Sequence, residues 1–159
     1  MRRRGFTLVE LIVVLILVGI LAVAVLPKFA NQLTFKTRGF ADQALVTLQY
    51  ARKVAVASRR NVCVVVSGGN TLTLTMATLA GSAQTCSASV ILPASSTNTL
   101  QTPSSVSFSG AFSIIFDGQG RALDSGRVLL ATNATVSIVG DVTYTLGVTA
   151  GTGFPDVLP

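Results

Sequence analysis

The sequence predicts an α+β protein in which one long amino-terminal helix is followed by an antiparallel β-sheet or small sandwich. Two observations lead to this fold class. Residues 6–60 carry first an apolar run and then an apolar stripe with helical spacing, whereas the pattern from residue 61 onward alternates with a period of two. Short Gly-, Asn- and Asp-containing turns separate the later segments. The 159 residues are enough for one domain of ordinary size.

The composition excludes several classes of function. Half of the residues are apolar, 11% are charged, and His and Trp are absent. Without His, no catalytic dyad or triad can use an imidazole base, and no metal site can use an imidazole ligand. Six acidic residues and two cysteines leave little material for other catalysis. We therefore expect no enzymatic activity, no cofactor and no metal.

The net charge of +6 is unevenly placed. Three of the twelve basic residues lie in 2–4 and seven lie in 28–60, whereas residues 61–159 hold two arginines and four aspartates. The last two thirds of the chain are therefore slightly acidic. A basic domain that binds nucleic acid is not indicated, although the overall pI is high.

The first apolar segment is long enough to cross a membrane. Residues 11–26 are sixteen residues without a charge, and from Phe6 to Leu26 the only strongly polar residue is Glu10. About 20 apolar residues span a bilayer as a helix, so residues 6–27 are predicted to be a transmembrane and assembly helix. A secretory signal peptide, with an A-x-A site at 22–24, and an ordinary single-pass anchor remain alternatives. Glu10 argues against the signal peptide, because a carboxylate within the membrane costs free energy.

The residues Gly5-Phe6-Thr7-Leu8-Val9-Glu10 and the apolar run after them resemble the class III signal of type IV pilins and pseudopilins. This resemblance implies that residues 1–5 are a leader, removed between Gly5 and Phe6 by a prepilin peptidase, and that the new amino group of Phe6 is methylated. It implies a single-pass protein of the bacterial inner membrane with its globular domain in the periplasm. Its partners would be other pilin or pseudopilin subunits and the inner-membrane assembly platform.

In a filament of pilin-like subunits, Glu10 is expected to bind a charged group of a neighbouring subunit. A lone carboxylate inside an apolar segment is by default a functional group with a partner. In a bundle of parallel helices, Glu10 of one subunit can pair with the Phe6 ammonium of a neighbour, and each charge then relieves the desolvation of the other. The alternative is that Glu10 merely reaches the membrane interface.

A kink is expected later in the same helix. Gly19 and Pro27 fall where pilin-like proteins commonly place a Gly and a helix-bending Pro. Pro27 removes one backbone hydrogen bond and clashes with the preceding turn, which predicts the bend independently of the resemblance.

Residues 28–60 are predicted to continue as an amphipathic helix. Its apolar stripe consists of Phe40, Ala44, Leu48, Ala51 and Ala55. The basic residues of this range are expected on a solvated face, with Arg59 and Arg60 closing the last turn, where cations suit the helix dipole. A continuous helix from residue 6 to residue 60 would be about 80 Å long, so its first half must extend into lipid or into a bundle of like helices.

Residues 61–159 form the predicted β-rich globular domain. A hairpin is predicted from strands at 62–66 and 72–76 with a turn between them. Residues 80–105 are expected to be a long loop with one short strand. The predicted short strands are 89–92, 106–109, 113–116, 121–123, 128–131, 135–139 and 142–148. Asp117 and Asp124 flank a Gly-rich segment but lack the other ligands of a calcium loop, so a turn is expected there.

Cys63 and Cys86 are the only cysteines. In a domain beyond the inner membrane, such a pair most simply forms a disulfide. Two buried free thiols are the alternative, and a metal site of two isolated cysteines is not expected. A disulfide would place this domain outside the cytosol.

The globular part resembles the GspH/FimT group of minor pilins and pseudopilins, on residues 51–61 and on Ile115-Phe116-Asp117 before a Gly-rich turn. Residues 60–63, Arg-Asn-Val-Cys, are also similar to minor pilins of the mannose-sensitive haemagglutinin type. The resemblance implies a structural subunit of a type IV pilus or a type II secretion pseudopilus. DNA uptake, as in some FimT-type pilins, is the alternative function, but residues 142–159 contain no Lys or Arg to contact phosphates. The choice between pilus and pseudopilus stays open.

Overall fold

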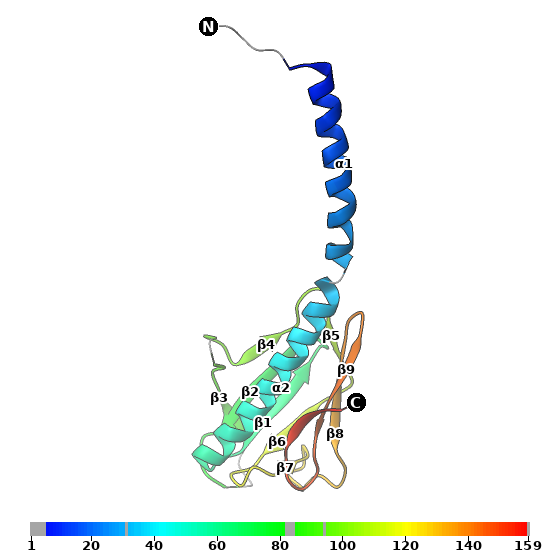
Figure 1. The fold of residues 1–159 in the computed structure, drawn as a ribbon. Coiled ribbons are helices and arrows are strands. Elements are labelled where there is room, and N and C mark those ends of the chain that lie inside the picture. Colours follow the sequence, from blue (N-terminus) through cyan, green and yellow to red (C-terminus); the bar gives the residue numbers. More distant parts are fainter. Residues whose placement is uncertain (1–5, 31, 82–84, 94, 159) are drawn as a thin grey trace. The chain divides into compact units, whose positions relative to one another are not determined.

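Figure 1 shows the fold in a computed structural model, which describes residues 6–30, 32–81, 85–93 and 95–158. The side chains of residues 23–30 and 32 lie outside this description. The chain divides into two compact units, Met1–Leu33 and Thr34–Pro159, and each is described by itself.

Two helices account for the amino-terminal part of the chain. Helix α1 spans Leu8–Ala30 and helix α2 spans Gln32–Ser58. The predicted stripe of α2 is confirmed, since Phe40 is 4% exposed and the other four members are fully buried. This burial is what fixes α2 to the strands, because helix stability in proteins comes mainly from packing of an apolar face.

Helix α2 ends two residues earlier than the sequence suggested. Arg59 has a left-handed backbone with φ of 54°, its N–H donates to the Val56 carbonyl at 3.3 Å, and the Arg60 N–H donates to the Ala55 carbonyl at 3.2 Å. These two bonds are those of a Schellman cap. Arg59 and Arg60 therefore lie beyond the last turn instead of closing it.

In the part of the chain that the structure describes, all strand pairings are antiparallel and the strands form two sheets. The first sheet has the order β3-β2-β1-β6-β7, with β4 also paired to β2, and the second has the order β10-β9-β8-β5. The strands of the first sheet are β1 Val62–Ser67, β2 Thr71–Ala77, β3 Cys86–Ser89, β4 Thr99–Gln101, β6 Ser113–Phe116 and β7 Ala122–Leu123. Those of the second are β5 Ser107–Ser109, β8 Ala134–Val139, β9 Thr143–Val148 and β10 Pro155–Leu158.

The predicted hairpin is confirmed, with Val64 opposite Leu74 in the β1–β2 register. Two strand predictions need correction, and two strands were missed. The strand expected at 128–131 is reduced to one isolated bridge between Leu129 and Leu123, because β7, the strand beside it after the Asp124 turn, has only two residues. The strand expected at 89–92 lies at β3 instead. Strands β4 and β10 were not predicted, since both are short and lie in segments rich in polar residues or Pro.

The core lies between α2 and the strands of both sheets (Figure 1). Helix α2 reaches the second sheet through Phe40, whose ring packs edge-on against that of Phe108 in β5 with 5.3 Å between centroids. It reaches a loop of the first sheet through Tyr50, whose hydroxyl donates to the Ile91 carbonyl at 3.1 Å. The observed class is therefore α+β, as predicted, with two small sheets sharing one helix.

Candidate functional site

The amino-terminal helix presents an apolar surface that its own chain leaves open. The large apolar side chains from Phe6 to Leu21 are 47–76% exposed in the structure. Such side chains lose their unfavourable contact with water only when lipid or other helices cover them. Judged by length and hydropathy over the described part of the chain, no helix qualifies as a membrane span.

Thr7 and Glu10 shape the start of α1. The backbone N–H of Glu10 donates to the Thr7 hydroxyl at 3.3 Å, and the N–H of Leu11 donates to the Thr7 carbonyl at 3.2 Å. Thr7 is therefore the N-cap and Glu10 takes the N3 position, although its carboxylate does not accept from the Thr7 N–H as it would in a full capping box. The helix dipole favours an anion in this first turn. Among the described residues, the Glu10 carboxylate has no hydrogen bond or ion pair, so it is available to a group from outside.

The other amino-terminal site residues remain predictions. Gly5 lies outside the described residues, and Phe6 is 76% exposed next to the cap. Helix α1 continues through Gly19 and Pro27, and a Cβ added at Gly19 would meet nothing within 4 Å. The side chain of Pro27 lies outside the description. The kink expected there is therefore untested.

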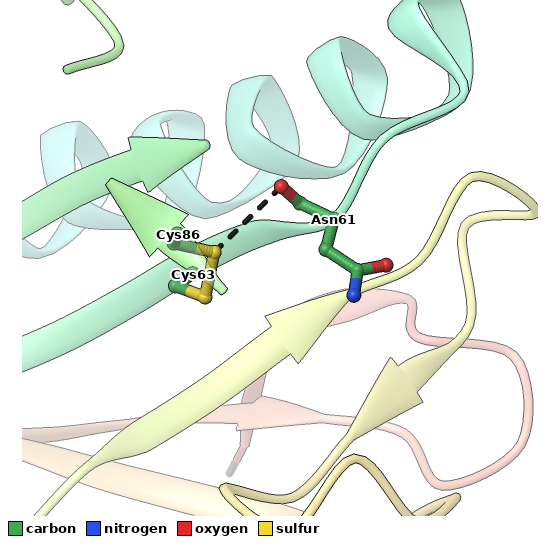
Figure 2. The surroundings of a disulfide bond; sticks show 3 residues. All are labelled: Asn61, Cys63 and Cys86. Carbon is green, nitrogen blue, oxygen red and sulfur yellow. Dashed lines mark hydrogen bonds between the residues drawn. A yellow bond between two sulfur atoms is a disulfide. The ribbon is translucent and has the colours of Figure 1, made fainter. Parts of the chain in front are cut away.

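Cys63 and Cys86 form a disulfide in the structure (Figure 2). It joins β1 to β3, which flank β2 on either side, with 6.0 Å between the two Cα atoms. The Cys86 sulfur lies 3.7 Å from the Asn61 carbonyl oxygen. This is a contact and not a true hydrogen bond, because a disulfide sulfur carries no hydrogen. The bridge fastens the first strand of the domain to the segment beyond the β1–β2 hairpin.

Asp117 organises the turn between β6 and β7. Its side chain is 94% buried; Oδ1 accepts from the backbone N–H groups of Gln119 and Arg121, and Oδ2 accepts from the Arg121 guanidinium at 2.8 Å. All these acceptor positions are used inside the turn. The carboxylate therefore serves the fold, as the sequence indicated when it favoured a turn over a calcium loop.

Arg52 was not recognised from the sequence as a structural residue. Its Nε donates to the Gly120 carbonyl at 2.9 Å and its Nη2 donates to the Thr152 carbonyl at 3.1 Å. One guanidinium thus ties α2 to the β6–β7 turn and to the β9–β10 turn. The available signal was the Gly-rich character of both turns, which lets their backbones come close to the helix.

An open cavity of about 530 Å³ lies beside the β6–β7 turn, lined by residues that include Arg59, Asn61, Asp117 and Arg121. Among the described residues that line it, the one carboxylate, Asp117, is committed to the turn and is not available as a base. No cluster of three potential metal ligands occurs among the described residues. The apolar helix with its single carboxylate is therefore the feature with the most specific chemistry.

Comparison with known families identifies the chain. Residues 1–26 match the prokaryotic N-terminal methylation motif. Residues 40–150 match the family described as type II transport protein GspH, which is more than half of the chain. The chain belongs to the GspH family. No curated protein matches it.

Solved structures with the same fold include two minor pilin or pseudopilin proteins. The type IV minor pilin FimU of Pseudomonas aeruginosa is similar in two crystal forms. The first has 18% identity and a TM-score of 0.51, over 77% of this chain and 92% of the FimU chain. The second has 17% identity and a TM-score of 0.53, over 82% of this chain and 90% of the FimU chain. The minor pseudopilin EpsH of the Vibrio cholerae type 2 secretion system shows 14% identity and a TM-score of 0.53, over 80% of this chain and 96% of its own. At these identities the likeness establishes the pilin-like fold alone.

The two family matches confirm two expectations from the sequence. Pilin-like subunits are structural proteins, so this GspH-family chain is a structural subunit and not an enzyme. The match to the methylation motif covers residues 1–26, which confirms the resemblance drawn from Gly5, Phe6 and Glu10.

Proposed function

We propose that this GspH-family chain is a minor subunit of a type IV pilus or a type II secretion pseudopilus and that it enters the filament through α1. The observation that carries the proposal is the exposed apolar surface from Phe6 to Leu21 with one carboxylate, Glu10, in its first turn. While the chain is a single-pass anchor of the inner membrane, lipid covers this surface. In the filament, parallel helices of neighbouring subunits cover it instead.

Processing supplies the charge that completes the site. Cleavage between Gly5 and Phe6 by a prepilin peptidase creates an ammonium group on Phe6, which keeps its positive charge after one methylation. Glu10 of one subunit and Phe6 of the next then form an ion pair within an apolar bundle. Pairing relieves the desolvation of both groups, whereas a subunit that stays alone in the membrane keeps its carboxylate without a partner.

The proposal predicts a specific defect for Glu10→Gln, which keeps the size of the side chain and removes its charge. Removing one partner of a buried ion pair costs about 3–5 kcal/mol, so incorporation into filaments should fall by at least about a hundredfold. The matched control is Asp42→Asn, which removes one charge from the exposed face of α2. Filament fractions would be quantified against the membrane-bound pool; normal incorporation of Glu10→Gln would refute the pairing.

The intact mass of the membrane form tests processing and anchoring. We expect a chain that begins at Phe6 and carries one added methyl group. A chain beginning at Val25 would instead support a cleaved secretory signal peptide, and an unprocessed chain would support an ordinary anchor. Genes beside the coding sequence would decide between a pilus and a secretion pseudopilus.

DNA capture, as in FimT-type minor pilins, is the less supported alternative. Of the two arginines in residues 61–159, Arg121 is already paired with Asp117 at 2.8 Å. The other arginine, Arg127, alone supplies too little positive charge for a phosphate-binding surface on the strands.

A further inference from the structure

One end of the unit Thr34–Pro159 is built from two segments that are far apart in the sequence. The hydroxyls of Thr34 and Thr37, in the first turns of α2, donate to the carboxylate of Asp141 in the β8–β9 turn. Figure 1 shows this turn beside the start of α2. The unit begins at Thr34, so the chain enters the unit from α1 at this end. We call residues 34–38 and 140–142 the anchor-side end.

The anchor-side end exposes two large apolar side chains, one from each segment. Phe35 is 76% exposed, and Val142, next to Asp141, is 43% exposed. A single exposed apolar residue is ordinary on a protein surface. Here two of them lie at the end of the unit that adjoins the apolar helix α1. Their position therefore indicates contact with the surface that α1 enters.

Two cations flank Phe35 on the surface of α2. Lys36 and Arg38 are exposed, and at 3.6 residues per turn they lie to either side of Phe35. Within the described part of the chain, neither forms an ion pair. The acidic groups nearby are Asp141, which already accepts hydrogen bonds, and Asp42, one helical turn beyond Arg38. Long cationic side chains beside an aromatic ring suit an anionic lipid surface, because their charges reach phosphates while the ring and the alkyl stems contact apolar groups.

The length of chain between the predicted membrane segment and Phe35 allows this contact. Eight positions separate residue 27, the end of that segment, from Phe35, which is about 12 Å at the rise of a helix. The headgroup layer is about 5–8 Å deep on each side of the hydrocarbon. The anchor-side end therefore meets this layer when the chain leaves the membrane at an angle. No other part of the unit lies as close to the membrane segment along the chain.

We propose that the anchor-side end rests on an anionic membrane surface, with Phe35 and Val142 in the headgroup layer and Lys36 and Arg38 on lipid phosphates. The inference rests on the proposed single-pass anchor and adds to it a second contact, made by the globular unit. A subunit that enters the filament must break this contact. Recruitment then depends on the charge of the lipid as well as on Glu10.

Tryptophan fluorescence tests the contact, because the chain contains no Trp and each variant then carries a single probe. The full chain would be reconstituted at low density in vesicles of phosphatidylcholine, with and without phosphatidylglycerol. In the anionic vesicles, Phe35→Trp and Val142→Trp should show blue-shifted emission that is quenched by lipids brominated near the headgroup. In phosphatidylcholine alone, or at high salt, both effects should be weaker.

Val46→Trp is the matched control for position. Val46 is 59% exposed on the same face of α2 as Phe35, but it lies eleven residues, or about 16 Å, farther from the anchor. Its emission should stay that of a solvent-exposed Trp in both kinds of vesicle. Lys36→Gln and Arg38→Gln, each added to Phe35→Trp, should each lower the ratio of lipid-bound to free probe by about fivefold at low salt.

Leu15→Trp, within the apolar surface of α1, reports on the anchor separately. If lipids brominated deep in the acyl chains quench this probe while Phe35→Trp stays unquenched in anionic vesicles, the surface contact is wrong and the proposed anchor stands. If Leu15→Trp stays unquenched, the anchor and the surface contact are both wrong. Equal quenching of Val46→Trp and Phe35→Trp would also overturn the proposal, as would quenching that survives the loss of both cations undiminished.

Discussion

Thr37 of α2 donates a hydrogen bond of 3.1 Å to Oδ1 of Asp141, in the turn between β8 and β9. The hydroxyl of Thr34 donates to the other oxygen of the same carboxylate, and the Val142 N–H donates to Oδ1 at 2.9 Å. Two successive turns of α2 are thus fastened to one hairpin of the second sheet. The hydrogen bond from Thr34, followed by those from Thr37 and the backbone, holds the pKa of Asp141 below its ordinary value of 3.8.

This relationship predicts a pH dependence of stability. Because the pKa of Asp141 is lower in the folded chain than in the unfolded chain, its contribution is present above pH 3.8 and is lost as the pH falls through the folded-state pKa. The urea midpoint of the parent chain should therefore fall more steeply below about pH 4 than that of Asp141→Asn. Parallel curves for the two chains would show that the carboxylate makes no net contribution. Since Asp141 is exposed, the difference should be small.

Gly140, beside Asp141, predicts a steric effect. A Cβ at this position would overlap the Thr37 side chain, so Gly140→Ala should destabilise the chain by roughly 1–3 kcal/mol. Gly39, in the same helix as Thr37, has open space around it, and Gly39→Ala should stabilise α2 by up to about 1 kcal/mol. Thermal unfolding of both variants measures the two effects, and equal shifts in one direction would contradict the contact.

Asp117 and Asp124 form a second matched pair. Each caps a turn, but Asp117 is buried and also pairs with Arg121, whereas Asp124 is half-buried and accepts from the Val128 N–H at 2.9 Å. Asp117→Ala should cost about 2–3 kcal/mol, because it leaves buried donors without an acceptor, and Asp124→Ala should cost about 1 kcal/mol. Chemical denaturation would measure both, and similar losses would mean that the burial of Asp117 does not matter.

The disulfide gives a prediction for reduction. Cys63 and Cys86 are separated by 23 positions, and closing a loop of this size stabilises the folded state by about 3 kcal/mol in the chain-entropy model. Reduction should lower the free energy of unfolding by this amount. A variant with both cysteines changed to Ser should show the same loss and no response to the reductant; if the parent chain also fails to respond, the bond is absent in solution.

The charge distribution predicts weak binding of DNA. Residues 142–159 contain no Lys or Arg, so few counterions can be displaced by this part of the domain. A gel-shift titration at low salt with the chain from about residue 30 onward should show weak binding with a shallow salt dependence. Tight binding abolished by Arg127→Ala would instead support the DNA-uptake alternative.

The sequence predicted the features that follow from periodicity. The stripe from Phe40 to Ala55 and the hairpin of β1 and β2 were both correct, because each buries a regular apolar face. The end of α2 was placed two residues too late. The residue type does not predict that Arg59 takes a left-handed backbone conformation. In the structure, the backbone of Arg59 in this conformation lies close to Gly118.

Contacts between distant segments were beyond the reach of the sequence. Arg52 was assigned to a solvated face, yet it bonds to carbonyls 68 and 100 positions away. Strand β10 was missed because its four residues begin with Pro and show no alternation. Glu10 could be recognised from the sequence alone, because a carboxylate within an apolar run is unusual whatever its tertiary contacts are.

The boundary between the two compact units falls before Thr34, and the buried residues of the described chain begin at Thr37. In the proposed filament, substitutions in Met1–Leu33 change how the subunit enters without altering the packing of Thr34–Pro159. Conversely, substitutions in the exposed loops of Thr34–Pro159 leave the apolar surface of α1 unchanged. Subunits with the same α1 surface and different exposed loops can therefore share one such filament.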